Sequence, residues 1–200
     1  WGIRFSNFNL KIKIKIKMKI ITTIFALMAL SMSSYAEQSN ENWKVLVGSG
    51  QSHVGWGGTK EAVKTYDLIF QHETIKPSAE NSKYRKSFLF EVPVHIVRAP
   101  YSSYMTGVNV YHKWQITNND KIQPYALIGG GGLYTNANIP GTSSKIRGTY
   151  GAGIGLQLNL NKDFKYSIET RFHHVSNGSI KSPNDPLNSH KVLIGLDFKI

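Results

Sequence analysis

The chain has 200 residues, of which 24 are Lys or Arg and 12 are Asp or Glu, so its formal net charge is +12. That length fits one domain or two small ones. The absence of cysteine excludes a disulfide framework, thiol catalysis and a thiolate metal site. A basic excess of this size is typical of nucleic-acid-binding proteins, so the position of the charge along the chain decides what it means.

The N-terminal 36 residues have the three parts of a secretory signal peptide. They hold six basic residues and no acid, and an apolar run follows that is too short to cross a bilayer as a helix. Small residues, Ser34 and Ala36, stand third and first before the expected cleavage site. We expect a start at Met18 and cleavage after Ala36. Residues 1–36 would then be upstream sequence plus signal peptide, and 37–200 the mature domain.

Much of the basic excess belongs to this leader. Without it, residues 37–200 carry a net charge of +6. The alternation of Lys and Ile over 11–17 would also suit a basic strand or an arm that binds nucleic acid. The leader pattern favours secretion, and we therefore expect no nucleic-acid partner.

Polar and apolar residues alternate along the mature part in runs of about ten, bounded by Gly, Pro, Asn, Asp and Ser. Such alternation predicts β-strands. No run approaches the roughly 20 apolar residues of a membrane helix. Eight strands are predicted, at 43–50, 65–74, 84–97, 104–117, 122–135, 146–160, 164–177 and 189–200.

Short turns alternate with long connections between these strands. This pattern, the strand length and the leader are typical of an outer-membrane barrel, and eight strands fill its interior with side chains. The predicted fold is all-β, an eight-stranded antiparallel transmembrane β-barrel of the Gram-negative outer membrane. Turns at 118–120 and 161–163 would face the periplasm, and 75–83 is long for a periplasmic turn. The outward connections would be 51–65, 98–103, 136–145 and 178–188.

The last strand supports the membrane assignment. Val192, Ile194 and Leu196 share one face with Phe198 and Ile200, as in the terminal strand of outer-membrane barrels, which usually ends in an aromatic residue. A soluble ligand-binding barrel would show the same alternation with its apolar face inward. The leader and the terminal strand together favour the membrane.

Strand 164–177 places polar residues on its apolar face. Glu169 and Arg171 share the charged face, which must line the lumen because a charge facing lipid costs about 2–4 kcal/mol at the midplane. His174 and Ser176 therefore continue the lipid-facing row, and Asn188 lies on the same side of the next strand. A Ser and a His within reach of each other indicate an activated nucleophile.

The residues around this pair carry a family resemblance. The segment Arg-Phe-His-His-Val-Ser-Asn-Gly at 171–178, followed by Lys-Ser-Pro-Asn at 181–184 and Asn-Ser-His at 188–190, resembles the PagL-type lipid A 3-O-deacylases, also described as acyloxyacyl hydrolase-like proteins. The resemblance implies an eight-stranded outer-membrane barrel that hydrolyses the ester-linked 3-hydroxyacyl chain at position 3 of lipid A. It implies no cofactor and no metal. The partners would be lipid A or lipopolysaccharide of the outer leaflet and membrane lipids, with a homodimer left open.

The family uses a Ser-His-Glu triad on the outer wall, and the motif assigns its members here. Ser176 would be the nucleophile and His174 the general base. Asn177, with backbone N–H groups of the turn that contains Ser179, would form the oxyanion hole.

The third member departs from the family pattern. Its acidic position falls on Asn188, which can orient a histidine but offers no carboxylate to stabilise the imidazolium. Asp185, in the same supporting loop as Asn184, is the alternative acid. His190 is an alternative base.

Other readings remain open beside this one. A non-catalytic eight-stranded barrel of structural or adhesin type would leave Ser176 without a chemical role. His173 should face the lumen and pair with Glu169 rather than act in catalysis. The remaining histidines are scattered without metal-ligand spacing.

Overall fold

The computed structural model describes residues 42–54, 58–75, 82–98, 102–136, 143–160 and 164–198. The predicted leader lies outside these ranges. None of the described residues belongs to a helix long and apolar enough to cross a membrane. They form eight strands: β1 (Asn42–Ser52), β2 (Lys64–Ile75), β3 (Tyr84–Arg98), β4 (Ser102–Ile116), β5 (Ile122–Thr135), β6 (Ile146–Asn159), β7 (Phe164–Ser176) and β8 (Leu187–Phe198).

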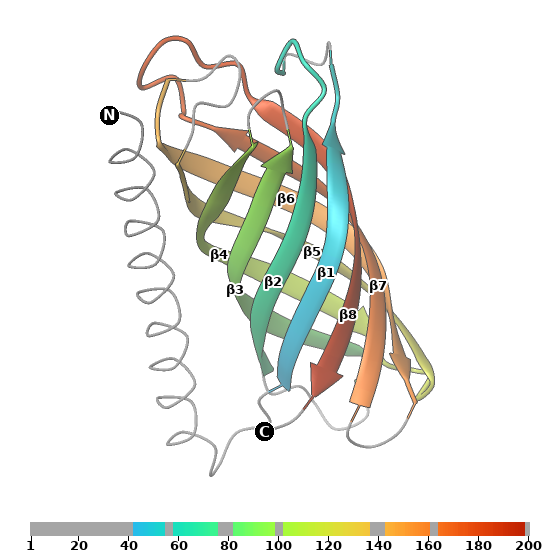
Figure 1. Cartoon of the computed structure of the whole chain (residues 1–200). Coiled ribbons are helices and arrows are strands. Elements are labelled where there is room, and N and C mark those ends of the chain that lie inside the picture. Colours follow the sequence, from blue (N-terminus) through green and yellow to red (C-terminus); the bar gives the residue numbers. More distant parts are fainter. Residues whose placement is uncertain are drawn as a thin grey trace, which may run out of the picture. The chain divides into compact units, whose positions relative to one another are not determined.

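The eight strands close into one antiparallel barrel. Each strand pairs with its neighbour in sequence, and β1 pairs with β8, so that Trp43 lies opposite Phe198 (Figure 1). Closure leaves no sheet edge unpaired, which is what a strand-built protein in lipid requires. The predicted fold class is confirmed, and the predicted strand ends agree with the observed ones within two residues.

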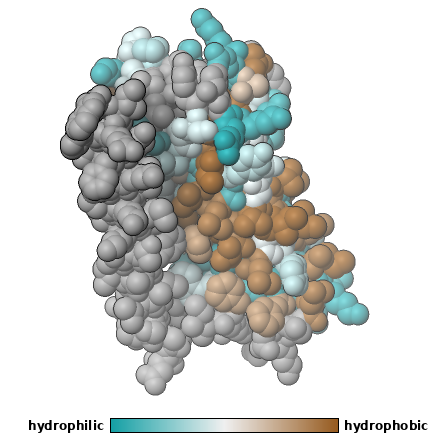
Figure 2. Space-filling model, viewed as in Figure 1, coloured by the Kyte–Doolittle hydropathy of each residue, from teal (hydrophilic) through white to brown (hydrophobic). Residues whose placement is uncertain are grey.

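The outer wall of the barrel is apolar. Ile154 of β6, Ile168 of β7 and Val192 of β8 are 64%, 51% and 58% exposed, which is unusual for large aliphatic side chains in water. Figure 2 shows brown, hydrophobic side chains gathered over the barrel wall, with teal, hydrophilic ones toward its upper end. This distribution fits a wall surrounded by lipid tails.

The inner face carries the charges, as predicted. Near the ends of β1 and β8, Lys44 pairs with Asp197 at 3.1 Å, and Lys113 of β4 pairs with Glu73 of β2 at the same distance. All four side chains are buried. Buried charges of opposite sign must be paired in this way, because each alone would carry a large desolvation penalty.

A second group of charges lies higher in the barrel. Arg171 of β7 contacts Glu91 at 2.9 Å and Glu169 at 2.5 Å, and Tyr125 donates to Glu169 at 3.0 Å. The expected pairing of Glu169 with His173 is wrong, because Arg171 and Tyr125 occupy that carboxylate. His173 does face the lumen, where its Nε2 lies 2.7 Å from the hydroxyl of Thr149.

An apolar cluster closes the interior near the outer loops. Its six members come from strands or connections at this end and are all nearly inaccessible. They are Val63, Val97, Met105, Leu133, Val175 and Leu187.

Three outer connections meet around the start of β8. The His53 N–H donates to the Asn188 carbonyl at 2.8 Å, and the Thr59 N–H donates to Pro186 at 3.0 Å. From the β5–β6 connection, the Ser143 N–H donates to the Pro183 carbonyl at 3.2 Å. The β7–β8 connection is therefore held by residues distant from it in sequence.

Candidate active site

His174 and Ser176 lie on the outer face near the end of β7, as the alternation predicts. Both are half-buried, whereas the residues between and beside them face the lumen. Across the β6–β7 ladder, Tyr150 lies opposite His174 and Gly148 lies opposite Ser176. The Tyr150 ring stacks on the His174 ring, with centroids 4.2 Å apart and planes inclined by 19°. Tyr150 thus fixes the plane of the imidazole, while Gly148 places no side chain beside the serine.

His174 is also held from the β8 side. Asn188 lies directly opposite it in the β7–β8 ladder, and the His174 Nδ1 lies 2.6 Å from the Asn188 Oδ1. An amide oxygen only accepts, so this contact puts the imidazole proton on Nδ1 and leaves Nε2 as the basic nitrogen. That tautomer is the one a general base needs.

The β1–β2 connection covers Asn188. Asn188 is only 9% exposed, and a Cβ placed on Gly58 would lie 3.6 Å from its Nδ2. The same Cβ would come within 2.9 Å of the Pro186 carbonyl oxygen. Only glycine lets the connection approach this closely, so Gly58 belongs to the construction of the site.

The chain turns sharply after Ser176. Gly178 and Ser179 have φ angles of 64° and 60°, in the left-handed region. Such a conformation is easy for glycine and uncommon for serine. The turn brings the Gly178 N–H to 3.4 Å from the Ser176 hydroxyl oxygen. A backbone donor beside a nucleophilic oxygen is the arrangement from which an oxyanion hole is built.

Asn177 and Asn184 brace this turn. Asn177 is 3% exposed, and its side-chain Nδ2 donates to the Lys181 carbonyl at 2.6 Å. Asn184 accepts from the Asn177 N–H at 2.8 Å and donates to the Ser179 hydroxyl at 3.3 Å. The structure therefore brings these predicted residues together, with Asn177 packed beneath the turn.

The two alternative residues have other surroundings. No hydrogen bond joins Asp185 to His174 in the described part of the chain, and Asn188 occupies the Nδ1 side of that ring. His190 is hydrogen-bonded through Nδ1 to the Nε2 of His53, and its ring meets that of Phe172 edge-on.

Three contributors to this site lie outside the sequence motif. They are Tyr150, Gly148 and Gly58. The strand register alone could have placed Tyr150 and Gly148 beside the pair. No pattern signals Gly58, because it lies more than 100 residues before Ser176.

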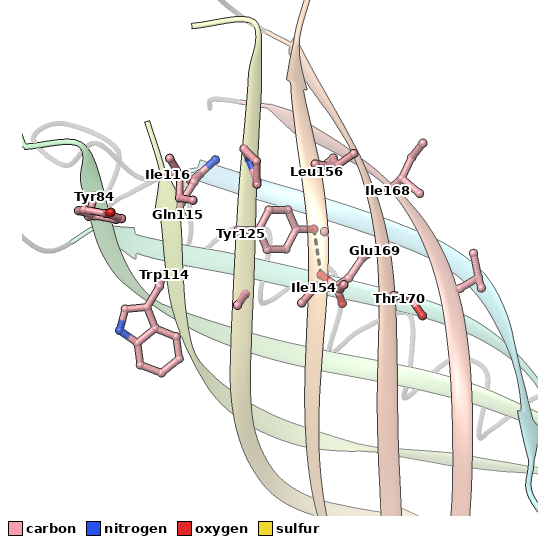
Figure 3. Close-up of a pocket in the computed structure, with 14 residues that line it drawn as sticks. Tyr84, Trp114, Gln115, Ile116, Tyr125, Ile154, Leu156, Ile168, Glu169 and Thr170 are labelled. Carbon is pink, nitrogen blue, oxygen red and sulfur yellow. Dashed lines mark hydrogen bonds between the residues drawn. The ribbon is translucent and has the colours of Figure 1, made fainter. Parts of the chain in front are cut away.

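An apolar furrow runs along the outer wall below the site. Its upper part has a volume of about 550 Å³ and reaches His190 and Phe172. Its lower part, of about 800 Å³, is drawn in Figure 3, where Ile154, Leu156 and Ile168 lie along the wall and Tyr125 reaches toward Glu169. The two parts share Trp114, Ala126, Ile154 and Thr170.

Within the described ranges, no three His, Cys, Asp or Glu side chains converge as metal ligands do. The site as described consists of a serine, an oriented histidine and backbone donors. Such a set suits acyl transfer through a covalent intermediate.

Comparison with known proteins agrees with these observations. No curated protein sequence matches the chain. The crystal structure of the outer membrane enzyme PagL superposes with a TM-score of 0.59 at 16% identity, covering 80% of this chain and 99% of that one. Neisserial surface protein A (NspA) superposes with a TM-score of 0.59 at 8% identity, covering 81% and 98%. These likenesses concern the fold alone.

The family comparison is more specific. The family described as "Lipid A 3-O-deacylase (PagL)" matches residues 64–197, which run from the start of β2 to the penultimate residue of β8 and include the whole β7–β8 connection. With its barrel in the outer membrane and its oriented histidine beside Ser176, the chain belongs to the PagL lipid A 3-O-deacylase family.

Proposed function

We propose that this protein removes the ester-linked 3-hydroxyacyl chain from position 3 of lipid A, with Ser176 as nucleophile. The observation that carries the proposal is the contact between His174 and Asn188, which orients a basic nitrogen on the lipid-facing wall beside a serine. Family membership supplies the substrate class.

In the first step, the His174 Nε2 takes the proton of the Ser176 hydroxyl as the Oγ attacks the ester carbonyl. The negative charge that develops on the carbonyl oxygen is received by the Gly178 N–H, which already lies beside the Oγ, with the Ser179 N–H as second donor. Collapse of the tetrahedral species breaks the ester C–O bond. His174 gives that proton to the departing sugar oxygen, which leaves as a hydroxyl group.

In the second step, water hydrolyses the acyl-serine with His174 again as base. Asn188 keeps the Nδ1 proton in place throughout both steps. Because Asn carries no charge, it orients the imidazolium without stabilising its charge as a carboxylate would. Asn177 and Asn184 act by holding the turn that presents the donors.

The furrow gives the substrate a place on the wall. An acyl chain that lies along Phe172 and Ile154 would exchange lipid contacts for protein contacts of similar polarity. Lipid A reaches the site by lateral diffusion in the outer leaflet, so an enclosed pocket is unnecessary. The residual positive charge of the barrel suits anionic head groups.

The test is to express the protein in a Gram-negative cell with ordinary lipid A and to record lipid A mass spectra. We expect loss of the mass of one hydroxyacyl chain. Ser176→Ala and His174→Ala should abolish the loss, whereas Ser167→Ala, a buried serine on the lumen face of the same strand, should retain it. Unchanged spectra with a correctly inserted barrel would refute the proposal.

A barrel without catalysis is the second candidate. The likeness to Neisserial surface protein A equals the likeness to PagL in TM-score, and Asn188 stands where the family resemblance expects an acid. This candidate predicts that Ser176→Ala changes neither the lipid A of the cell nor any reaction of the purified protein.

A further inference from the structure

Arg147 is a buried cation that takes no part in the ion pairs described above. It lies at the outer end of β6, on the lumen face, and is 1% exposed. Its Nε, Nη1 and Nη2 have no hydrogen-bond partner among the described residues. A guanidinium is always charged and presents five donors, so a buried one needs an acceptor.

The surroundings of Arg147 are poor in acceptors. Its neighbour across the β5–β6 ladder is Leu133, and Leu133 belongs to the apolar cluster that closes the barrel, together with Val175 of β7. The carboxylates lower in the barrel are already paired with other cations, namely Lys44, Lys113 and Arg171. Several other buried oxygens also lack a partner among the described residues, so the strand register has to decide which of them lies next to Arg147.

Asn177 supplies the matching acceptor. Its Oδ1 is buried and has no partner among the described residues, whereas its Nδ2 is already bound to Lys181. Gly148 lies opposite Ser176, so the register carried one step further puts Arg147 opposite Asn177. Both side chains are buried, on the face opposite to that of Ser176. Directly opposed residues of an antiparallel pair have Cβ atoms about 5 Å apart, within reach of an arginine.

We propose that Arg147 is a positioning residue of the active site: its guanidinium donates to the Asn177 Oδ1 through one bridging water. The catalytic role of this contact rests on the proposed function. The charged donor polarises the Asn177 amide and strengthens its bond to Lys181. The turn is thereby fixed from below, with the Gly178 N–H held toward the place where the oxyanion forms.

Such a role predicts a particular kinetic effect. Misaligned oxyanion donors weaken binding of the transition state and leave binding of the acyl chain in the furrow intact. In the folded enzyme, Arg147→Met should therefore lower kcat by about 10- to 100-fold with KM changed less than about twofold. Arg147→Lys, which keeps a cationic donor, should recover part of that loss.

The matched control is Lys44→Met. It removes another buried lumen cation, which pairs with Asp197 at the opposite end of the barrel and takes no part in the site. We expect kcat of the folded control to equal the wild-type value. Folded protein would be quantified first, from the mobility difference between unheated and heated barrel on a gel. An unchanged kcat in Arg147→Met, or an equal loss in Lys44→Met, would overturn the proposal.

A double-mutant cycle tests the named contact. In an Asn177→Ala background, Arg147→Met should lower kcat no further than about twofold, because the acceptor is already gone. Losses that multiply would show that Arg147 acts elsewhere, and the assignment would fall.

A structural measurement separates this proposal from the proposed function. Hydrogen exchange of the backbone amides at 177–181 should become about tenfold or more faster in Arg147→Met, with the strands β1–β4 unchanged. If the wild type hydrolyses no lipid A, the proposed function fails while this measurement still tests the contact. Unchanged exchange at the turn would overturn the contact itself.

Discussion

Asn188 sets what His174 can do. Its amide oxygen lies 2.6 Å from the His174 Nδ1 and accepts a hydrogen bond from it. The β1–β2 connection covers Asn188 at Gly58. Asn188 thus sets the orientation and the tautomer of His174, but it does not supply the negative charge that would stabilise an imidazolium. The family resemblance expects an acidic residue at position 188, so this is where the candidate site differs most from the family pattern.

Two substitutions at this position have opposite expected effects. Asn188→Ala should slow deacylation by about 10- to 100-fold, because the imidazole loses the acceptor that orients it. Asn188→Glu should raise the rate or leave it unchanged. The rate of hydroxyacyl release from lipid A by folded protein measures both, with Asn159→Ala at the far end of β6 as control. A large fall in Asn188→Glu would contradict the assignment of the triad.

Residue-level features divide into those that the sequence predicts and those that it does not. The faces of His174 and Ser176 follow from strict alternation and a charged opposite face, so they could be predicted. The inward packing of Asn177 and the pairing of His173 with Thr149 could not, because they depend on which side chains meet across the lumen. Such contacts depend on the strand register of the closed barrel, which cannot be read from a single sequence.

At the scale of elements, the connection between β1 and β2 contributes to the candidate site. It binds the start of β8 through His53 and Thr59 and crosses closely at Gly58. The distinctive residues of the family resemblance lie within 171–190, although the eight-strand architecture extends the resemblance over the whole mature chain. Close approaches between outer connections leave no periodic signal, whereas strands do, which is why the strand ends were predictable and this contact was not.

Gly58→Ala tests the role of that crossing. The added methyl group would meet the Pro186 carbonyl oxygen at 2.9 Å, so the connection or the start of β8 must shift. We expect deacylation to fall several-fold while the barrel still folds. In Gly132→Ala the nearest atom lies 3.9 Å from the new methyl group, and activity should be retained. Equal activity of the two variants would show that the crossing does not support Asn188.

The furrow on β5–β7 offers a second test at this scale. Ala152 is exposed on its floor beside Phe172, so Ala152→Phe should fill the upper part. We expect kcat/KM to fall more for long acyl esters than for short ones. Val47→Phe, on the exposed outer wall of β1, which supplies none of the residues that line the furrow, should leave the ratio unchanged. The ratio of kcat/KM for the two ester lengths is the measurement, and an unaltered ratio in Ala152→Phe would place the acyl chain elsewhere.

For the whole molecule, stability depends on paired charges inside an apolar shell. Arg171 contacts both Glu91 and Glu169 in the buried lumen. Its removal would leave two carboxylates without their shared cation. Breaking a buried ion group in this way costs about 3–5 kcal/mol.

Arg171→Met should therefore lower the unfolding temperature of the detergent-folded barrel strongly. Thr170→Met, the same new side chain one residue away on the outer wall, should change it little because that face meets lipid or detergent. Thermal unfolding followed by gel mobility measures both. Similar midpoints for the two variants would indicate that the lumen carboxylates are neutral in the folded protein.

The apolar cluster beneath the outer connections has a consequence for transport. Six side chains with at most 2% exposure pack together inside the barrel at that end, and the interior of an eight-stranded barrel is filled by side chains. We therefore expect that dissolved salt does not screen the buried ion pairs and that hydrated ions do not cross. Reconstituted in a planar bilayer, such a barrel should be electrically silent and should leave the permeability barrier of the membrane intact.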